Sequence, residues 1–190
     1  AQVTVLDADP VRLRTLDDRL GGRACLMLLT ASNLRKVCTF ADVLVTCVLI
    51  PGERTPKLVS RELVRSMKAR SVIMDISIDQ GGCVETSRPT TLQDPTFVDE
   101  NVMHYCVPNM SSGIARTATL ALTYAVLPYL KEIAHSGVVQ AVGADAALGK
   151  GIMLARGEVV SSAVAAAFGL AWRSLGEVLA KDAAHKVATL

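Results

Sequence analysis

The stretch from Ser71 to Asn109 decides the fold: it begins SVIMDISIDQGG, continues CVETSRPTT, and ends NVMHYCVPN. Its first and last parts are short apolar runs with β-branched residues, and each run ends in polar and turn residues. Such unbroken runs are typical of strands buried on both faces of a parallel sheet. In open α/β sheets ligands bind at the carboxyl ends of the strands, which is where Asp79 to Gly82 follow the first run. This stretch therefore predicts an α/β fold with its chemistry at that edge.

Strand-like and helix-like segments alternate through the first part of the chain. The Asp9-Pro10 pair is typical of a helix N-cap followed by proline in the first turn. Further helices are expected to begin at Ser32 and Ser60. The predicted strands are residues 3–7, 24–29, 41–47, 72–78 and 103–107. This alternation indicates a mostly parallel sheet with helices on its faces.

The composition changes near residue 115. From Arg116 an Ala/Leu-rich helix is predicted to run to about His135, followed by short elements and a final helix ending near Lys186. We therefore predict two parts: residues 1–115 as the domain of alternating strands and helices, and residues 116–190 as a connecting helix with a C-terminal segment.

The front of the chain lacks a glycine-rich turn. In dinucleotide-binding folds the first strand and a G-x-G-x-x-G turn hold the pyrophosphate at a helix N-terminus. No such motif precedes Asp7, yet a strand that ends in an acidic residue is the usual second strand of these folds. We therefore expect a doubly wound, Rossmann-type parallel sheet that lacks its first strand, followed by a helical tail. We interpret the chain as a fragment rather than a natural truncation.

Composition narrows the classes of partner. Hydrophobic residues make up 51% of the 190 residues, and the net charge of +2 has no basic block of the kind that follows a phosphate backbone. The longest uncharged apolar stretches, 117–130 and 159–172, are shorter than the ~20 residues of a spanning helix. We expect neither a nucleic-acid nor a membrane partner. The five cysteines lack metal-ligand spacing, which predicts no metal site and free thiols in a reducing cytoplasm.

Two carboxylates are the main functional candidates. Asp7, at the end of its strand, can accept hydrogen bonds from the adenine ribose hydroxyls of a dinucleotide and repel a 2′-phosphate. It can equally be a turn residue that competes with Asp9 for the helix cap. Asp79 can act as an acid/base or orienting group beside a nicotinamide, or close the strand in an Asx-turn.

The segment ADVLVTCVLIPGERTPKLVSRELVRSMKARSVIMDISIDQGGCVETSRPTT (residues 41–91), followed by HYCVPNM (104–110), resembles the alanine dehydrogenase branch of the alanine dehydrogenase/pyridine nucleotide transhydrogenase family. The likeness runs from about Val3 to Leu130. It implies NAD-dependent oxidative deamination of L-alanine to pyruvate and ammonia by a longer enzyme. It also implies that residues 1–115 are part of an NAD-binding domain and that residues 116–190 would complete the catalytic domain. The family's substrate-binding Arg and Lys and its catalytic His would lie outside this sequence.

The resemblance assigns roles residue by residue. Asp79 falls on the active-site aspartate of the family, whereas Asp75 is interpreted as structural. The positions implied to bind the cofactor NAD are Asp7, Arg12, Val48, Leu49, Ile76, Val107, Asn109 and Met110. The sequence departs from the family pattern at Pro108, where a small residue is usual.

Partners and alternative functions follow from the same resemblance. The chain is expected to form a homo-oligomer or to associate with a missing N-terminal domain, because its predicted helix from Arg116 is apolar on most of its surface. The alternatives are a truncated, non-catalytic nucleotide-binding or partner subunit, and a relative with different chemistry in specialised metabolism. The transhydrogenase branch would continue into membrane segments or a partner subunit.

Overall fold

The computed structural model describes residues 1–180 of the chain. It divides into two compact units, which are described separately. The first unit comprises residues 1–49 and 55–108, and the second comprises residues 50–54 together with the part that follows residue 108.

The first unit begins with a parallel strand pair connected by a helix. Strand β1 (Thr4–Asp7) pairs in parallel with β2 (Cys25–Leu28), and α1 (Pro10–Leu20) lies between them in the chain. Asp9 caps α1 by accepting the Val11 N–H at 2.8 Å, and Pro10 occupies the first turn as predicted. The helix ends at Gly21, whose φ of 57° is a left-handed conformation that glycine adopts without steric cost.

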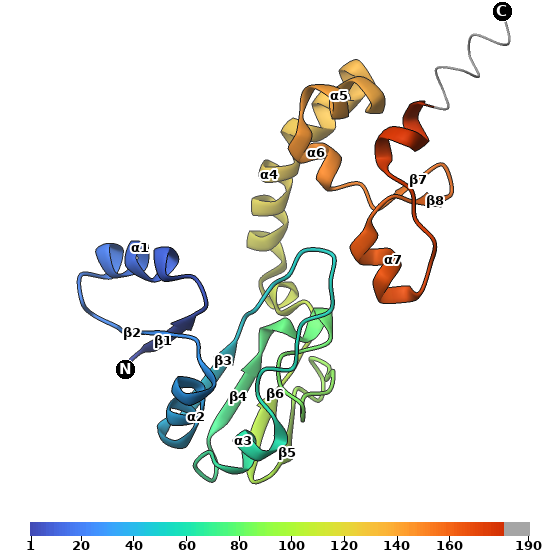
Figure 1. Ribbon diagram of the computed structural model, residues 1–190. Helices are drawn as coiled ribbons and strands as arrows, with labels where there is room; N and C mark the ends of the chain where they lie inside the picture. The colour runs from blue at the N-terminus through green and yellow to red at the C-terminus, as the bar shows by residue number, and fades with distance from the viewer. Residues whose placement is uncertain (181–190) are drawn as a thin grey trace, which may run out of the picture. The chain divides into compact units, whose positions relative to one another are not determined.

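A four-stranded sheet forms the centre of this unit, with its strands side by side in Figure 1. Its order is β3-β4-β6-β5, with three parallel strands and one antiparallel edge strand. The strands are β3 (Val43–Thr46), β4 (Val72–Asp75), β6 (Val102–Tyr105) and β5 (Thr96–Asp99). The helices that connect strands here are α2 (Ala31–Phe40) and α3 (Arg61–Arg65). The core consists of Cys38, Val59, Val64, Met67, Ile73, Val84 and Val102.

The predicted α/β class with a mostly parallel sheet is confirmed, but several predicted boundaries are wrong. The strand expected over residues 72–78 ends at Asp75, and residues 76–80 form the 3₁₀ helix η1 (Ile76–Gln80). Helix α2 is capped by Thr30 rather than Ser32, because the Thr30 hydroxyl accepts the Asn33 N–H at 3.1 Å. Strand β5 was not predicted, and β6 begins and ends earlier than residues 103–107.

His104 on β6 is a fully buried, hydrogen-bonded core histidine. Its Nε2 lies 2.7 Å from the Thr86 hydroxyl, and its Nδ1 lies 3.0 Å from the Val102 carbonyl oxygen. The ring stacks on Phe97 at a centroid distance of 4.8 Å, and the Arg88 guanidinium covers the Phe97 ring at 4.1 Å. A neutral ring with its proton on Nδ1 satisfies both hydrogen bonds. Burial lowers the pKa of His104 below its ordinary value of 6.5.

We expect the free energy of unfolding to decrease as the pH falls below 6.5, the ordinary pKa of histidine. In this range the unfolded chain binds a proton on His104, whereas the folded chain binds it only at lower pH. The contribution of His104 to stability is therefore fully present above the unfolded-state pKa, and it is lost as the pH falls through the folded-state pKa. Denaturant unfolding as a function of pH measures this. His104→Gln keeps an acceptor for Thr86 and should flatten the dependence, whereas His135→Gln, which changes an exposed histidine, should preserve it. An unchanged slope in His104→Gln would contradict the assignment.

The second unit contains a long helix followed by short elements. Its elements are η2 (Met110–Ile114), α4 (Ala115–Ser136), α5 (Val138–Ala144), α6 (Ala146–Lys150), β7 (Leu154–Ala155), β8 (Glu158–Val159) and α7 (Ser162–Phe168). Helix α4 matches the helix predicted from Arg116 to His135, and none of its residues is buried. The predicted helix end near Lys186 lies outside the described residues. Within residues 1–180, no helix has the length and apolar character needed to cross a membrane.

Candidate functional site

A cavity of about 290 Å³ lies where β3 and β4 reach their carboxyl ends. The chain segments that follow these two strands form its wall. The lining residues are Cys47, Val48, Leu49, Ile76, Ser77, Asp79 and Gln80. Pockets that enclose a drug-sized ligand measure about 300–1,000 Å³, so this cavity matches one ring-sized group rather than a complete dinucleotide.

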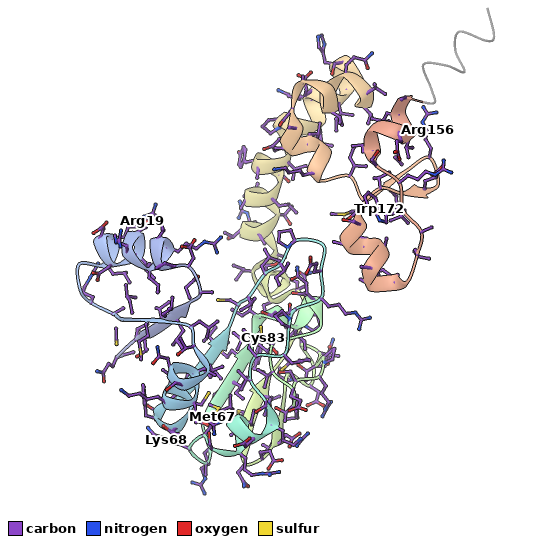
Figure 2. All side chains as sticks on the ribbon, in the orientation of Figure 1. Arg19, Met67, Lys68, Cys83, Arg156 and Trp172 are labelled. Atoms are coloured by element: carbon purple, nitrogen blue, oxygen red, sulfur yellow. The ribbon has the colours of Figure 1, made fainter. Side chains whose placement is uncertain are left out.

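A side-chain hydrogen bond joins the two segments that line the cavity. The Ser77 hydroxyl donates to the Val48 carbonyl at 2.9 Å, and the Cys83 thiol lies 3.3 Å from the Ser77 oxygen. Figure 2 shows Cys83 at this end of the four-stranded sheet, with Met67 and Lys68 at the opposite end. The Cys83 side chain has no exposed surface, and burial raises the pKa of its thiol, which favours a neutral packing role over a nucleophilic one.

The segment that follows Thr55 supports the cavity wall through its backbone. The Thr55 N–H donates to the Gln80 carbonyl at 2.9 Å, and the Leu58 and Val59 N–H groups donate to the Cys83 carbonyl at 2.9 and 3.1 Å. These bonds hold the chain as it leaves η1. Asp79 is exposed on η1, whereas the neighbouring Ile78 is buried and anchors the helix in the interior.

Asp7 and Arg12 lie around the turn between β1 and α1. Asp7 is half-buried, and its Oδ1 accepts the Asp9 N–H at 2.8 Å. Arg12 is exposed on the first turn of α1, with its Nε 3.5 Å from Asp9 Oδ2. Asp9, rather than Asp7, caps the helix, whereas Asp7 stabilises the preceding turn by accepting the Asp9 N–H.

The remaining predicted residues follow β6. The Val107 side chain is buried, so its backbone is the part available at this edge. Asn109 has a φ of 51°, in the left-handed region that asparagine tolerates better than most residues. Its carbonyl accepts the Ser112 N–H at 2.9 Å, and Met110 begins η2. Asn109 and Met110 belong to the second unit, whereas Val107 belongs to the first.

The structure thus brings Val48, Leu49, Ile76 and Asp79 to one cavity. Sequence reasoning missed three other residues of its lining, namely Cys47, Ser77 and Gln80. Ser77 was missed because residues 76–78 were interpreted as strand, and a strand would have directed alternate side chains to opposite faces. The short 3₁₀ helix instead brings Ile76, Ser77 and Asp79 to the same cavity.

The cavity combines apolar walls with one carboxylate. Leu49 and Ile76 are exposed apolar side chains at the ends of strands, with 65% and 45% of their surface accessible. Such side chains can pack against a flat ring, while the Asp79 carboxylate can accept a proton or orient a polar group. No cluster of His, Cys, Asp or Glu suited to a metal ion occurs in the described part of the chain.

An open, mostly parallel sheet with apolar and acidic residues at its carboxyl edge is typical of ligand-binding α/β proteins, including those that bind nucleotides. The model of the alanine dehydrogenase/PNT C-terminal domain matches residues 1–162. The chain is 45% identical over 170 residues to an alanine dehydrogenase of Halomonas elongata, and 47% identical over 171 residues to one of Methanococcus maripaludis. Each alignment covers 90% of this chain and 46% of the relative.

Solved structures give the same result. An L-alanine dehydrogenase structure matches with a TM-score of 0.77 and 40% identity, over 89% of this chain and 46% of that one. A transhydrogenase from Sinorhizobium meliloti matches with a TM-score of 0.64 and 25% identity, over 86% of this chain and 43% of that one. The chain belongs to the alanine dehydrogenase/PNT family and carries its C-terminal domain. It spans about half the length of these relatives.

Proposed function

We propose that this chain forms the cofactor-binding part of an NAD-dependent alanine dehydrogenase, which converts L-alanine and NAD to pyruvate, ammonia and NADH. The cavity at the ends of β3 and β4 carries the proposal, because it joins an apolar surface to the Asp79 carboxylate. The names of the relatives support the reaction. NAD supplies the hydride acceptor when it is bound, and the protein supplies orientation and electrostatics.

The residues of the cavity divide this work. Val48, Leu49 and Ile76 would pack against the cofactor and exclude water from the reacting carbon. Asp79 would accept a proton or orient the substrate amine in the same space. At the end of β6, the Val107 backbone would contact the cofactor as well. The resemblance also implies cofactor contacts for Asn109 and Met110, which belong to the second unit.

Asp7 would set the choice of cofactor. Its Oδ1 is held by the Asp9 N–H, which leaves Oδ2 without a donor among residues 1–180. A ribose hydroxyl can donate to that oxygen, and Arg12 would lie beside the same sugar. A 2′-phosphate would place negative charge against the carboxylate, so NAD is favoured over NADP.

The other half of the reaction requires residues beyond this chain. We propose that residues 1–115 serve the cofactor, and that residues 116–190 pack against an N-terminal catalytic domain or another subunit. The substrate-binding Arg and Lys and the catalytic His would come from that domain. The five free thiols support a reducing compartment, and the cytoplasm is the location we propose.

Alkylation of Cys47 tests the cofactor site directly. In a protein that contains this segment, we expect NAD to slow the reaction of Cys47 with iodoacetamide, because the thiol is exposed in the lining of the cavity. Cys25, which is exposed at the start of β2, serves as the internal control, and its rate of reaction should be the same with and without NAD. Modified peptides are quantified by mass spectrometry.

The same assay measures cofactor preference. At equal concentration NADP should protect Cys47 less than NAD, and Asp7→Ala should reduce the difference. Equal protection by NAD and NADP in the parent protein would refute the role of Asp7. No protection by NAD would refute the assignment of the cavity.

A further inference from the structure

Asp75 is a fully buried carboxylate that the proposed reaction does not use. It ends β4, and its Oδ1 accepts the Thr46 hydroxyl of β3 at 2.7 Å. Its Oδ2 accepts the Cys83 N–H at 3.0 Å and the Val84 N–H at 3.3 Å. One carboxylate therefore joins the ends of two strands to the segment that returns from η1. Hydrogen bonds to a charged acceptor are stronger than neutral ones, and a buried carboxylate requires them.

The backbone passes unusually close to this carboxylate at Gly82. A Cβ at this position would lie 2.7 Å from Asp75 Oδ2. The φ of 77° at Gly82 is also in the left-handed region that favours glycine. The sequence Asp79-Gln80-Gly81-Gly82 thus allows the chain to turn against Asp75, which explains the second glycine by packing rather than by ligand approach.

Lys57 holds the same segment through its carbonyl groups. Its ammonium Nζ donates to the Gly81 carbonyl at 2.7 Å and to the Val84 carbonyl at 3.1 Å. The segment from Gly81 to Val84 is consequently held on both sides: the Asp75 carboxylate accepts its N–H groups, and the Lys57 ammonium donates to its carbonyls. The two charges hold one end of the polypeptide that carries Asp79.

We propose that Asp75 is a positioning residue: with the help of Lys57, its buried carboxylate fixes the segment Ile76–Val84 and thereby the orientation of Asp79 in the cavity. This inference rests on the proposed function, since it assigns a support to the proposed active-site carboxylate. A misplacement of about 1 Å in a reacting group can reduce a rate by about 10²-fold. Asp75 contacts neither substrate nor cofactor in this role.

Three variants of the full-length enzyme test the proposal. Asp75→Ala should lower kcat per folded active site by roughly 10²-fold, with a smaller change in the KM for NAD. Asp75→Asn should recover most of kcat, because its amide oxygen can accept the Cys83 and Val84 N–H groups while its NH₂ donates to the Thr46 hydroxyl. Asp42→Asn changes an exposed carboxylate paired with Lys68 and should leave kcat unchanged.

A purely structural role would give a different result. It would reduce the folded fraction of Asp75→Ala while leaving kcat per folded site at the parental value, and that outcome would overturn the proposal. If Asp75→Ala does not fold, Lys57→Met provides a second test at an exposed position. It removes the ammonium contacts with the Gly81 and Val84 carbonyls and should lower kcat, with a smaller change in the KM for NAD. Parental kcat in Lys57→Met would then overturn it.

Hydrogen–deuterium exchange separates this inference from the proposed function. If the parent enzyme produces no NADH from alanine, the proposed function fails, and the amides of Cys83 and Val84 still report on the support. Faster exchange of these amides in Asp75→Ala or Lys57→Met than in Asp42→Asn would support the fixing role of the two charges. Unchanged exchange would overturn it.

Discussion

Asp79→Asn is expected to lower the kcat for alanine oxidation by about 10²–10⁴-fold, the usual contribution of general acid–base catalysis, with little change in the KM for NAD. Asparagine keeps the size of the side chain but can neither accept a proton nor carry a negative charge. The loss should therefore fall on the chemical step rather than on cofactor binding. Initial rates of alanine-dependent NADH formation by the full-length enzyme measure it.

Asp42→Asn provides the matched control for Asp79. It makes the same chemical change on an exposed aspartate immediately before β3, at the opposite end of the strand from the cavity. It should leave both kcat and KM unchanged. Near-parental turnover in Asp79→Asn would show that Asp79 is a turn residue of η1, and the proposed catalytic role would then be wrong.

Local signals in the sequence were sufficient where neighbouring residues determine the structure. Asp9, Pro10 and Gly21 define the beginning and end of α1 through contacts within one or two turns. The apolar run from Val72 likewise predicted β4, and the alternation of strands and helices predicted the parallel sheet. These elements depend on capping geometry and apolar patterning, which a sequence displays directly.

Predictions failed where contacts distant in sequence decide the structure. Residues 76–78 continue the apolar run of β4, but the strand ends at Asp75 and the chain turns into η1. The Asp75 carboxylate accepts the Cys83 and Val84 N–H groups, and these contacts hold the returning segment against the end of the strand. Strand β5 follows Pro95 and forms only by pairing with β6. The residues that line the cavity could be predicted only in part for the same reason, because the turn at Ile76 determines which side chains face the cavity.

The isolated 190-residue chain is expected to self-associate through α4. This helix contains Pro128 and few charges, and none of its residues is buried. Its large exposed apolar side chains are Leu120, Leu122, Tyr124, Val126, Leu127, Tyr129 and Leu130. An exposed apolar surface of this kind marks an interaction site or an aggregation-prone region. Sedimentation velocity at several concentrations measures the association.

The free energy gained by burying the apolar side chains of α4 is large enough for association to be detectable. Complete burial of a fully exposed Leu-sized side chain contributes about 1.5–3 kcal/mol. The four leucines of α4 are 41–66% accessible, so covering them supplies about half as much each, or about 3–6 kcal/mol together. This is comparable to the lower end of the roughly 4–15 kcal/mol of translational and rotational freedom lost on association. The remaining apolar residues of α4 then tip the balance toward the associated state.

Paired substitutions identify the surface responsible. Leu122→Gln with Tyr124→Gln removes two of the most exposed apolar side chains of α4, with 66% and 74% of their surface accessible, and should shift the chain toward monomer. Val11→Gln alters a similarly exposed apolar residue, 65% accessible, on α1 and should not change the association. A parent chain that sediments as a monomer and unfolds cooperatively on heating would contradict the prediction. In that case α4 is stable in water without a partner, and residues 116–190 do not need a further domain to cover them.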